Sequence, residues 1–176
     1  MTQGESQGEA PRTHTAAAMR TRLAPWLYLV AALAYALDRI TKVVAQHTLE
    51  GRPPIKLIPG VLDLSFTTNT GGAFGLFGGA SWLFFAATLV VSAIIVYASF
   101  SLSGKDSAVG LGLVLGGALG NLTDRLLGGH GLSGKVVDFI HLHHWPVFNV
   151  ADSAIVVGAV LIVIGTMRRG SRQRGS

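Results

Sequence analysis

The chain contains four long apolar segments, and each is long enough to cross the hydrocarbon core of a bilayer. They cover residues 24–45, 79–102, 107–128 and 149–167, and a membrane helix needs about 20 residues. Only 13% of all residues are charged and 49% are hydrophobic, whereas a soluble domain carries about 25% charged residues. The sequence therefore predicts an all-α membrane protein with four transmembrane helices.

The first apolar segment also has a feature of a cleaved signal peptide. The tripeptide AYA at 34–36 resembles a signal-peptidase site. The charged residues that follow it, Asp38, Arg39 and Lys42, fit a helical pattern better than a mature N-terminus. The membrane-helix interpretation of this segment is therefore preferred.

Basic residues concentrate at one end of the predicted helices. They precede the first segment, separate the second from the third, and follow the fourth: Arg12, Arg20, Arg22, Lys105, Arg168, Arg169, Arg172 and Arg174. The positive-inside rule makes this end cytoplasmic, so both termini are expected in the cytoplasm. Topology thus accounts for the net charge of +5, and no nucleic-acid partner is expected.

The polar ends of the chain flank a single domain. Residues 1–23 are predicted to form a disordered cytoplasmic tail, because they are polar and unpatterned. Residues 24–167 form the four-helix membrane domain, and 168–176 form a basic cytoplasmic tail whose part from residue 170 is expected to be disordered. One domain is the natural count at this length.

One of the two longer outer loops carries a strand pattern. In VLDLSFTT (61–68), apolar and polar residues alternate with a period of two, and prolines punctuate the preceding stretch 53–60. We therefore expect a small extracytoplasmic β-rich element that rests on the outer leaflet. The glycine-rich stretch 71–79 follows and contains Phe74; it is a candidate lid over a cleft.

Three acidic residues, Asp38, Asp124 and Asp152, fall inside predicted spans. A charge in hydrocarbon is costly, so each is a functional hypothesis. Measured from the basic residues at the cytoplasmic helix ends, their heights are roughly 24, 28 and 24 Å at the rise of an α-helix. Because the hydrocarbon core is about 30 Å thick, all three are expected in one layer near its outer edge.

Asp124 and Asp152 are expected to face each other across two neighbouring helices. The third and fourth segments run antiparallel and are joined by the outer loop 129–148. Gly117 and Gly120 share a helix face with Asp124, and small residues allow close helix approach. Neither acid has a basic residue four positions away in its own helix, so the two form a candidate catalytic pair rather than two separate structural acids.

A pair of carboxyl groups matches the chemistry of an aspartic peptidase. Two carboxylates in one site do not both ionise easily, so one keeps a proton. The ionised group takes a proton from water while the protonated group donates to the scissile carbonyl. Asp38 differs, because Lys42 lies four residues further on in the favourable acid-first order; an internal ion pair is expected there.

The role of Arg125 has two interpretations. Its side chain either extends to the lipid headgroups or binds a substrate phosphate or carbonyl.

Two other classes of protein are alternatives to an enzyme. A transporter or proton relay also buries acids, but it favours acids at the midplane and an inverted repeat, and neither is visible. A non-catalytic scaffold would not need paired acids.

The stretch HLHHWP (141–146) invites a metal interpretation, because His141 and His143 would share one face of a strand. Paired histidines without a carboxylate motif are weak support for a metal site, so no metal and no cofactor is predicted. Trp145 is expected to anchor the loop at the interface. The chain has no cysteine, which excludes thiol catalysis and cysteine-ligated metals.

Several motifs, in order along residues 24–167, resemble lipoprotein signal peptidase, the bacterial type II prolipoprotein signal peptidase family. They are Asp38 with Lys42, NTGGAFG (69–75), GGALGNLTDR (116–125), VVDF (136–139) and FNVADS (148–153). The resemblance implies an aspartic peptidase of the bacterial cytoplasmic membrane that cleaves prolipoproteins before a diacylglyceryl-modified cysteine. The implied partners are these precursors and membrane lipids, and the implied active site lies near the outer face.

The resemblance also assigns roles to residues. Asp124 and Asp152 would be the catalytic dyad, and Asp38 and Lys42 would support it. The residues that would line the site or hold substrate are Asn69, Gly71, Asn121, Arg125, Asp138, Asn149 and Ala151. Two positions depart from the family pattern: Gly72 stands where the family usually has Ala, and His141 where many members carry Asp.

Overall fold

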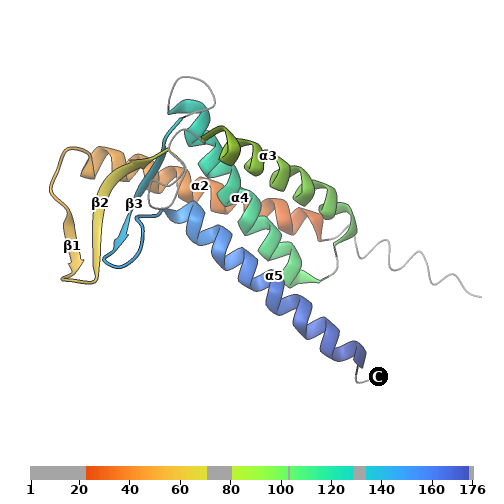
Figure 1. Cartoon of the computed structure of the whole chain (residues 1–176). Helices are drawn as coiled ribbons and strands as arrows, with labels where there is room; N and C mark the ends of the chain where they lie inside the picture. The colour runs from red at the N-terminus through yellow and green to blue at the C-terminus, as the bar shows by residue number, and fades with distance from the viewer. Residues whose placement is uncertain (1–22, 71–80, 103, 129–133, 175–176) are drawn as a thin grey trace, which may run out of the picture.

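The computed structural model describes residues 23–70, 81–102, 104–128 and 134–174. Its elements are helix α2 (Ala24–Leu49), strands β1 (Ile55–Ile58) and β2 (Leu62–Asn69), helix α3 (Ser81–Ala98), the 3₁₀ turn η2 (Ser99–Ser101), helix α4 (Lys105–Leu127), strand β3 (Val136–Leu142) and helix α5 (Val150–Arg174). Figure 1 shows the sheet at one end of the helices and the C-terminus at the other. The predicted combination of helices with a small β element is confirmed.

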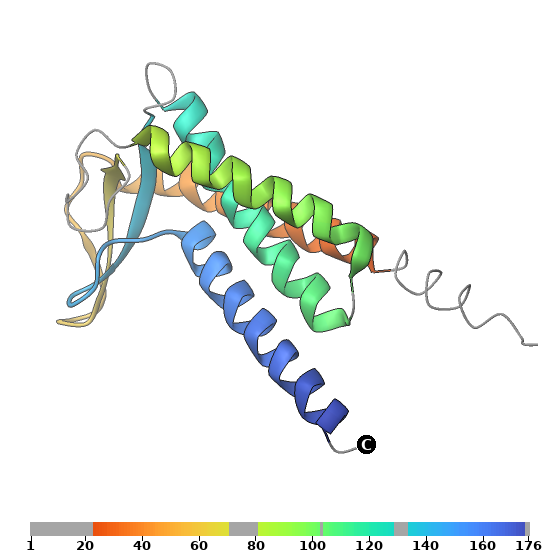
Figure 2. The same cartoon turned by 45° about the vertical axis from the view of Figure 1, so that its right-hand side comes forward.

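Helix α4 is the centre of the bundle, and it packs against α2, α3 and α5 (Figure 2). Its glycines bring the neighbouring backbones close. A Cβ atom at Gly116 would overlap the carbonyl oxygen of Ala31 on α2, and one at Gly117 would overlap that of Ala151 on α5. Small residues permit such close approach, so the predicted inward glycine face of this helix is confirmed.

We expect Gly117→Ala to destabilise the bundle, because the backbone oxygen of Ala151 cannot move aside without separating α4 from α5. Overpacking of this kind costs about 1–3 kcal/mol. Thermal unfolding in detergent measures the effect. Gly170→Ala on α5 is the matched control, since nothing lies within 4 Å of a Cβ placed there. Equal unfolding midpoints for the two variants would contradict the packing argument.

Apolar surface is exposed along the helices, including Leu33 on α2, Ile94 on α3 and Val160 on α5, which are 62%, 60% and 51% exposed. Within the described residues, Trp82–Ser101 and Val150–Ser171 are long and apolar enough to cross a membrane. The other two helices, α2 and α4, are interrupted by charged side chains. The count of four spans therefore remains a prediction.

The three strands form one antiparallel sheet in the order β1-β2-β3. Strand β2 confirms that the stretch with the alternating pattern forms a strand, although its burial does not alternate. Strand β3 pairs with it so that Thr67 lies opposite Asp138 and Asn69 opposite Val136. Phe139 packs with Ala45 and Leu49 in a small core that joins the sheet to α2. This packing holds the sheet beside the end of the bundle where the acidic residues lie.

The ends of two helices differ from the prediction. Helix α2 continues to Leu49, four residues beyond the predicted span, and α5 continues to Arg174. The expectation of disorder from residue 170 is therefore wrong for 170–174. Arginine and glutamine are good helix formers, and basic residues are favourable at a helix C-terminus. The predicted tail 1–23 lies outside the described residues except for Leu23.

Candidate active site

Asp152 is held at the start of α5 by a reciprocal capping arrangement. The backbone N–H of Asp152 donates to Asn149 Oδ1 at 2.9 Å, and Asp152 Oδ2 accepts from the backbone N–H of Asn149 at 3.3 Å. This is the geometry of a capping box, with residues three positions apart. The FNVADS motif therefore orients Asp152 while it begins the helix.

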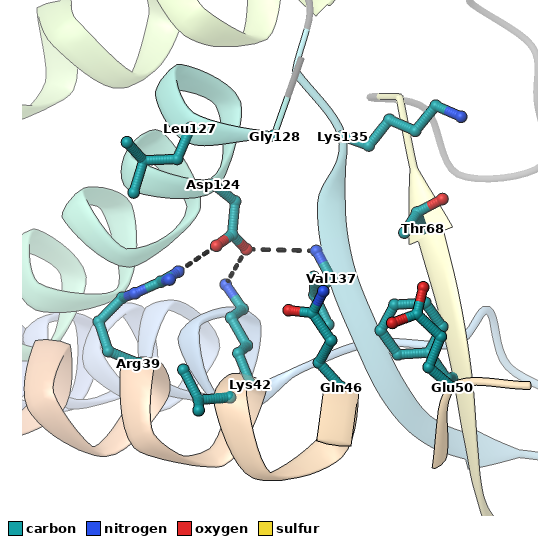
Figure 3. A pocket seen from close by; sticks show the side chains of 12 residues that line it. Arg39, Lys42, Gln46, Glu50, Thr68, Asp124, Leu127, Gly128, Lys135 and Val137 are labelled. Carbon is teal, nitrogen blue, oxygen red and sulfur yellow. Dashed lines mark hydrogen bonds and ion pairs between the residues drawn. The ribbon is translucent and has the colours of Figure 1, made fainter. Parts of the chain in front are cut away.

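Asp124, on the last turns of α4, is buried and paired with cations from α2 (Figure 3). Its Oδ1 contacts Arg39, and its Oδ2 lies 2.7 Å from Lys42 Nζ and accepts the backbone N–H of Val137 at 3.2 Å. The prediction that Asp124 is unpaired is wrong. Only residues four positions away in the same helix are visible as partners in the sequence, whereas both cations come from another helix.

Asn121 connects the two carboxyl groups. Its amide donates to Asp152 Oδ1 at 2.8 Å, and its Oδ1 accepts from Lys42 Nζ at 2.8 Å. The same Lys42 contacts Asp124, so the described contacts run from Asp124 through Lys42 and Asn121 to Asp152. Asp124 and Asp152 are thus linked through these two intermediates, and a direct meeting of the two carboxyl groups remains a prediction.

Asp38 is fully buried and ties α2 to α5. Its Oδ2 lies 2.9 Å from Lys42 Nζ, which confirms the expected internal ion pair. Its Oδ1 accepts the backbone N–H of Ala151 at 2.9 Å. A carboxylate is favourable at a helix N-terminus, so Asp38 stabilises the turn of α5 that carries Asp152. A Cβ at Gly120 would overlap Asp38, so glycine is needed there.

Asp138 on β3 joins the same network from the sheet. Its Oδ1 accepts from the amide of Asn149 at 2.6 Å, and the side chain of Asn69 also hydrogen-bonds to it. Burial, together with the nearby charge of Asp152, raises the pKa of Asp138 to about 7, although the hydrogen bonds from Asn149 and Asn69 and the charge of Lys42 oppose the shift. The strand thus presents a carboxyl group that is partly protonated near neutral pH.

We expect the stability of the protein to fall as pH rises from about 4 to 7, relative to Asp138→Asn. The folded state binds a proton at Asp138 over this interval, with a pKa of about 7 against the ordinary 3.8, and the unfolded state does not. Asparagine imitates the neutral carboxyl group, so it removes this dependence. The difference between the two proteins should reach on the order of 1–4 kcal/mol by pH 8. Thermal midpoints from pH 5 to 8.5 measure it, and parallel curves would contradict the shift.

Arg125 lies in the protein interior. It is 8% exposed, its guanidinium lies over the ring of Phe84 at 5.9 Å, and it donates to the carbonyl of Asn121 at 3.2 Å. It lines a pocket together with Asp152, Phe84 and Val91. Of the two interpretations left open by the sequence, this position agrees with a role in binding and does not agree with extension to the lipid headgroups.

The two aspartates face different pockets. Asp124 lines a pocket with Arg39, Lys42, Phe66 and other residues (Figure 3). Asp152 lines the pocket of Arg125 and also an apolar one on its other side, which includes Trp145 and Val156. None of these three pockets is lined by both carboxyl groups.

One residue of this network, Arg39, was not singled out from the sequence. A signal was present, since it lies three positions before Lys42 and therefore on the same helix face. Gly71 and the candidate lid 71–79 lie outside the described residues, so their proposed roles remain predictions.

Solved structures with the same fold are of bacterial membrane enzymes. One is 30% identical, with a TM-score of 0.73 over 83% of this chain and 90% of that chain. A second is 31% identical, with a TM-score of 0.69 over 80% of this chain and 91% of the other. The helical bundle with its buried polar network is therefore that of a bacterial membrane enzyme.

Similarity to known sequences identifies the family of this membrane enzyme. The family model of signal peptidase (SPase) II matches residues 30–168. The lipoprotein signal peptidase of Syntrophomonas wolfei is 46% identical over 138 residues, 78% of this chain and 89% of the relative. That of Rhodococcus jostii is 42% identical over 142 residues, 80% of this chain and 72% of the relative. The chain belongs to the signal peptidase II family, which confirms the resemblance noted in the sequence.

Proposed function

We propose that this protein is an intramembrane aspartic endopeptidase that removes signal peptides from prolipoproteins, with Asp124 and Asp152 as the catalytic dyad. It would cleave before a cysteine that carries diacylglycerol. The observation that supports the proposal most directly is the linkage of the two carboxyl groups through Asn121 and Lys42. Relatives that are 39–46% identical are lipoprotein signal peptidases.

The proposed reaction is a direct attack of water on the scissile carbonyl. One carboxylate of the dyad accepts a proton from the water, and the other carboxyl group donates its proton to the carbonyl oxygen. The tetrahedral intermediate then collapses, the C–N bond breaks, and the leaving nitrogen takes a proton back from the dyad. The proton belongs to the pair, and no acyl-enzyme forms.

Water requires an open position on each carboxyl group. Both oxygens of Asp124 are in contact with Arg39, Lys42 or Val137. The Lys42 side chain is 2% exposed, whereas that of Arg39 is 26% exposed. Arg39 is thus the contact that exchanges for water or substrate most readily, and its release would open Oδ1 of Asp124 toward the pocket in Figure 3.

The position of the network suits a lipid-modified precursor. The carboxyl groups lie near the end of the bundle that carries the sheet, and Arg169 at the opposite end contacts Ser107 near the start of α4. With the basic ends in the cytoplasm, as the positive-inside rule predicts, the dyad lies near the outer face. A precursor whose acyl chains are in the outer leaflet would place its scissile bond at this level.

The experiment that tests the proposal is cleavage of a purified precursor peptide with and without diacylglycerol on its cysteine. The protein, in detergent micelles, should cleave the modified peptide on the N-terminal side of the cysteine and leave the unmodified peptide intact. Mass spectrometry of the products identifies the bond. Equal cleavage of both peptides would contradict the lipid requirement, and cleavage of neither would contradict the proposed activity.

A further inference from the structure

A second cluster of chemically reactive side chains lies on the sheet, apart from the carboxylate network. It consists of Asp63 on β2, His141 on β3 and His143 just after β3. Asp63 and His141 are paired across the antiparallel ladder. The backbone N–H of His143 donates to the carbonyl of Val61 at 3.1 Å, which continues the pairing past the end of the strand. Because residues two apart share a face of a strand, both histidines lie beside Asp63.

The three side chains are already close together. One ligand atom from each lies within 4.8 Å of the other two. His143 Nε2 is 2.9 Å from Asp63 Oδ2, and the rings of His141 and His143 are stacked, with centroids 5.3 Å apart and planes 17° from parallel. Around a tetrahedral zinc ion, ligand atoms lie about 3.3 Å apart, so small rotations of the side chains would bring them to that spacing.

An Asp–His hydrogen bond alone does not account for the cluster. The carboxyl group of Asp63 is 9% exposed, and its second oxygen, Oδ1, is buried without a hydrogen-bond partner among the described residues. A buried acceptor without a partner costs free energy. The second ring, that of His141, is held beside the pair by the strand register and has no part in that hydrogen bond.

We propose that Asp63, His141 and His143 bind a divalent transition metal ion of the zinc type. Two imidazole nitrogens and one carboxylate oxygen are a ligand set that such ions accept, with a further position left for water. The stretch HLHHWP contains no carboxylate of its own. In the structure, Asp63 on the neighbouring strand β2 supplies one. A pocket lined by Gly60, Val61, Leu142, His143, His144 and Trp145 opens beside the cluster, so an ion can enter from solution.

The bound ion would join β2 to the segment between β3 and α5. That segment leads to Asn149, which caps the helix that carries Asp152. The proposed role of the metal is therefore to fix the end of the sheet and the approach to α5, and it takes no part in the chemistry of the dyad.

The test is metal binding to the full-length protein, purified with an affinity tag that contains no histidine and freed of metal with a chelator. Titration of Zn²⁺ against a chromophoric chelator should give one bound ion per chain. His141→Gln and His143→Gln should each weaken binding at least about tenfold, since loss of supporting groups alone costs 10–100-fold. His47→Gln on α2 is the matched control, because His47 is exposed and outside the cluster; the affinity of this variant for Zn²⁺ should be unchanged.

Absorption of bound Co²⁺ in the visible range provides a second readout, which should be present in the control and absent from both cluster variants. His141 is half-buried and the His143 side chain is 35% exposed, so the variants should fold, and circular dichroism checks this. If either variant folds and binds Zn²⁺ as tightly as the control, the proposed site is wrong. The absence of binding to the unaltered protein at about 1 mM Zn²⁺ would also overturn it.

Discussion

Asp152→Asn is expected to lower the rate of precursor cleavage at least about a thousandfold while the helix bundle stays folded. The substitution removes the ability to exchange a proton and keeps the shape of the side chain. The amide of Asn121 donates to Oδ1 of Asp152 and the backbone N–H of Asn149 donates to Oδ2. The single oxygen of asparagine can accept one of these two hydrogen bonds, so the variant loses the other one at a cost of about 1–3 kcal/mol, which the folded bundle should tolerate. The loss of activity should therefore come from the chemistry and not from unfolding.

Asp124→Asn should abolish cleavage as well, but with a structural cost. Asp124 compensates the charges of Lys42 and Arg39, and an amide cannot do so. We therefore expect a lower unfolding midpoint for this variant than for Asp152→Asn. If the two carboxyl groups act as a unit, the double variant should be no less active than either single one, because such effects are not additive.

The control for both variants is Asp106→Asn. Asp106 is exposed in the first turn of α4, far along the helix from Asp124, and its substitution should leave the rate within about twofold. Rates follow from product formation with the diacylglyceryl peptide, and folding from thermal unfolding. A folded Asp152→Asn protein with more than a tenth of the unaltered rate would exclude Asp152 from the dyad.

The sequence predicted which aspartates lie at one level of the bundle, because helix geometry alone determines their depth. Asp38, Asp124 and Asp152 lie at similar heights in helices of known direction, and the inward glycine face orients Asp124. All three are found around Lys42 and Asn121. The catalytic roles assigned to them rest on chemistry and family resemblance, and these roles remain proposals.

The partners of the aspartates could not be predicted in the same way. A contact between Arg39 and Asp124 depends on the rotation of α2 about its axis, which hydrophobic periodicity leaves open when the helix has apolar residues on most faces. The register between β2 and β3 could not be predicted from the sequence either. The alternating pattern indicates a strand within 61–68, but it does not say that Asp63 is opposite His141. A shift by one residue would turn the aspartate to the other face.

Replacing Lys42 by methionine is expected to cost about 3–5 kcal/mol of stability, the usual effect of removing one partner of a buried ion pair. The side chain is 2% exposed, and its ammonium group contacts Asp38 at 2.9 Å, Asp124 at 2.7 Å and Asn121 at 2.8 Å. The contact with Asn121 is a hydrogen bond, and those with the two carboxylates are ion pairs. Methionine has a similar length, but it leaves Asp124 with Arg39 and leaves Asp38 without a cation among the described ion pairs.

A second substitution separates stability from chemistry. In Lys42→Met/Asp38→Asn, one of the uncompensated charges is gone, and the asparagine oxygen can still accept the backbone N–H of Ala151, as Asp38 does at 2.9 Å. We expect the double variant to recover much of the lost stability and none of the activity, because Lys42 also links Asp124 to Asn121 and hence to Asp152.

Arg39→Gln is the matched control for Lys42→Met. Its side chain is 26% exposed and pairs with Asp124 alone, so its unfolding midpoint should fall far less. If Lys42→Met unfolds at the same temperature as Arg39→Gln, the buried lysine does not hold α2 and α4 together.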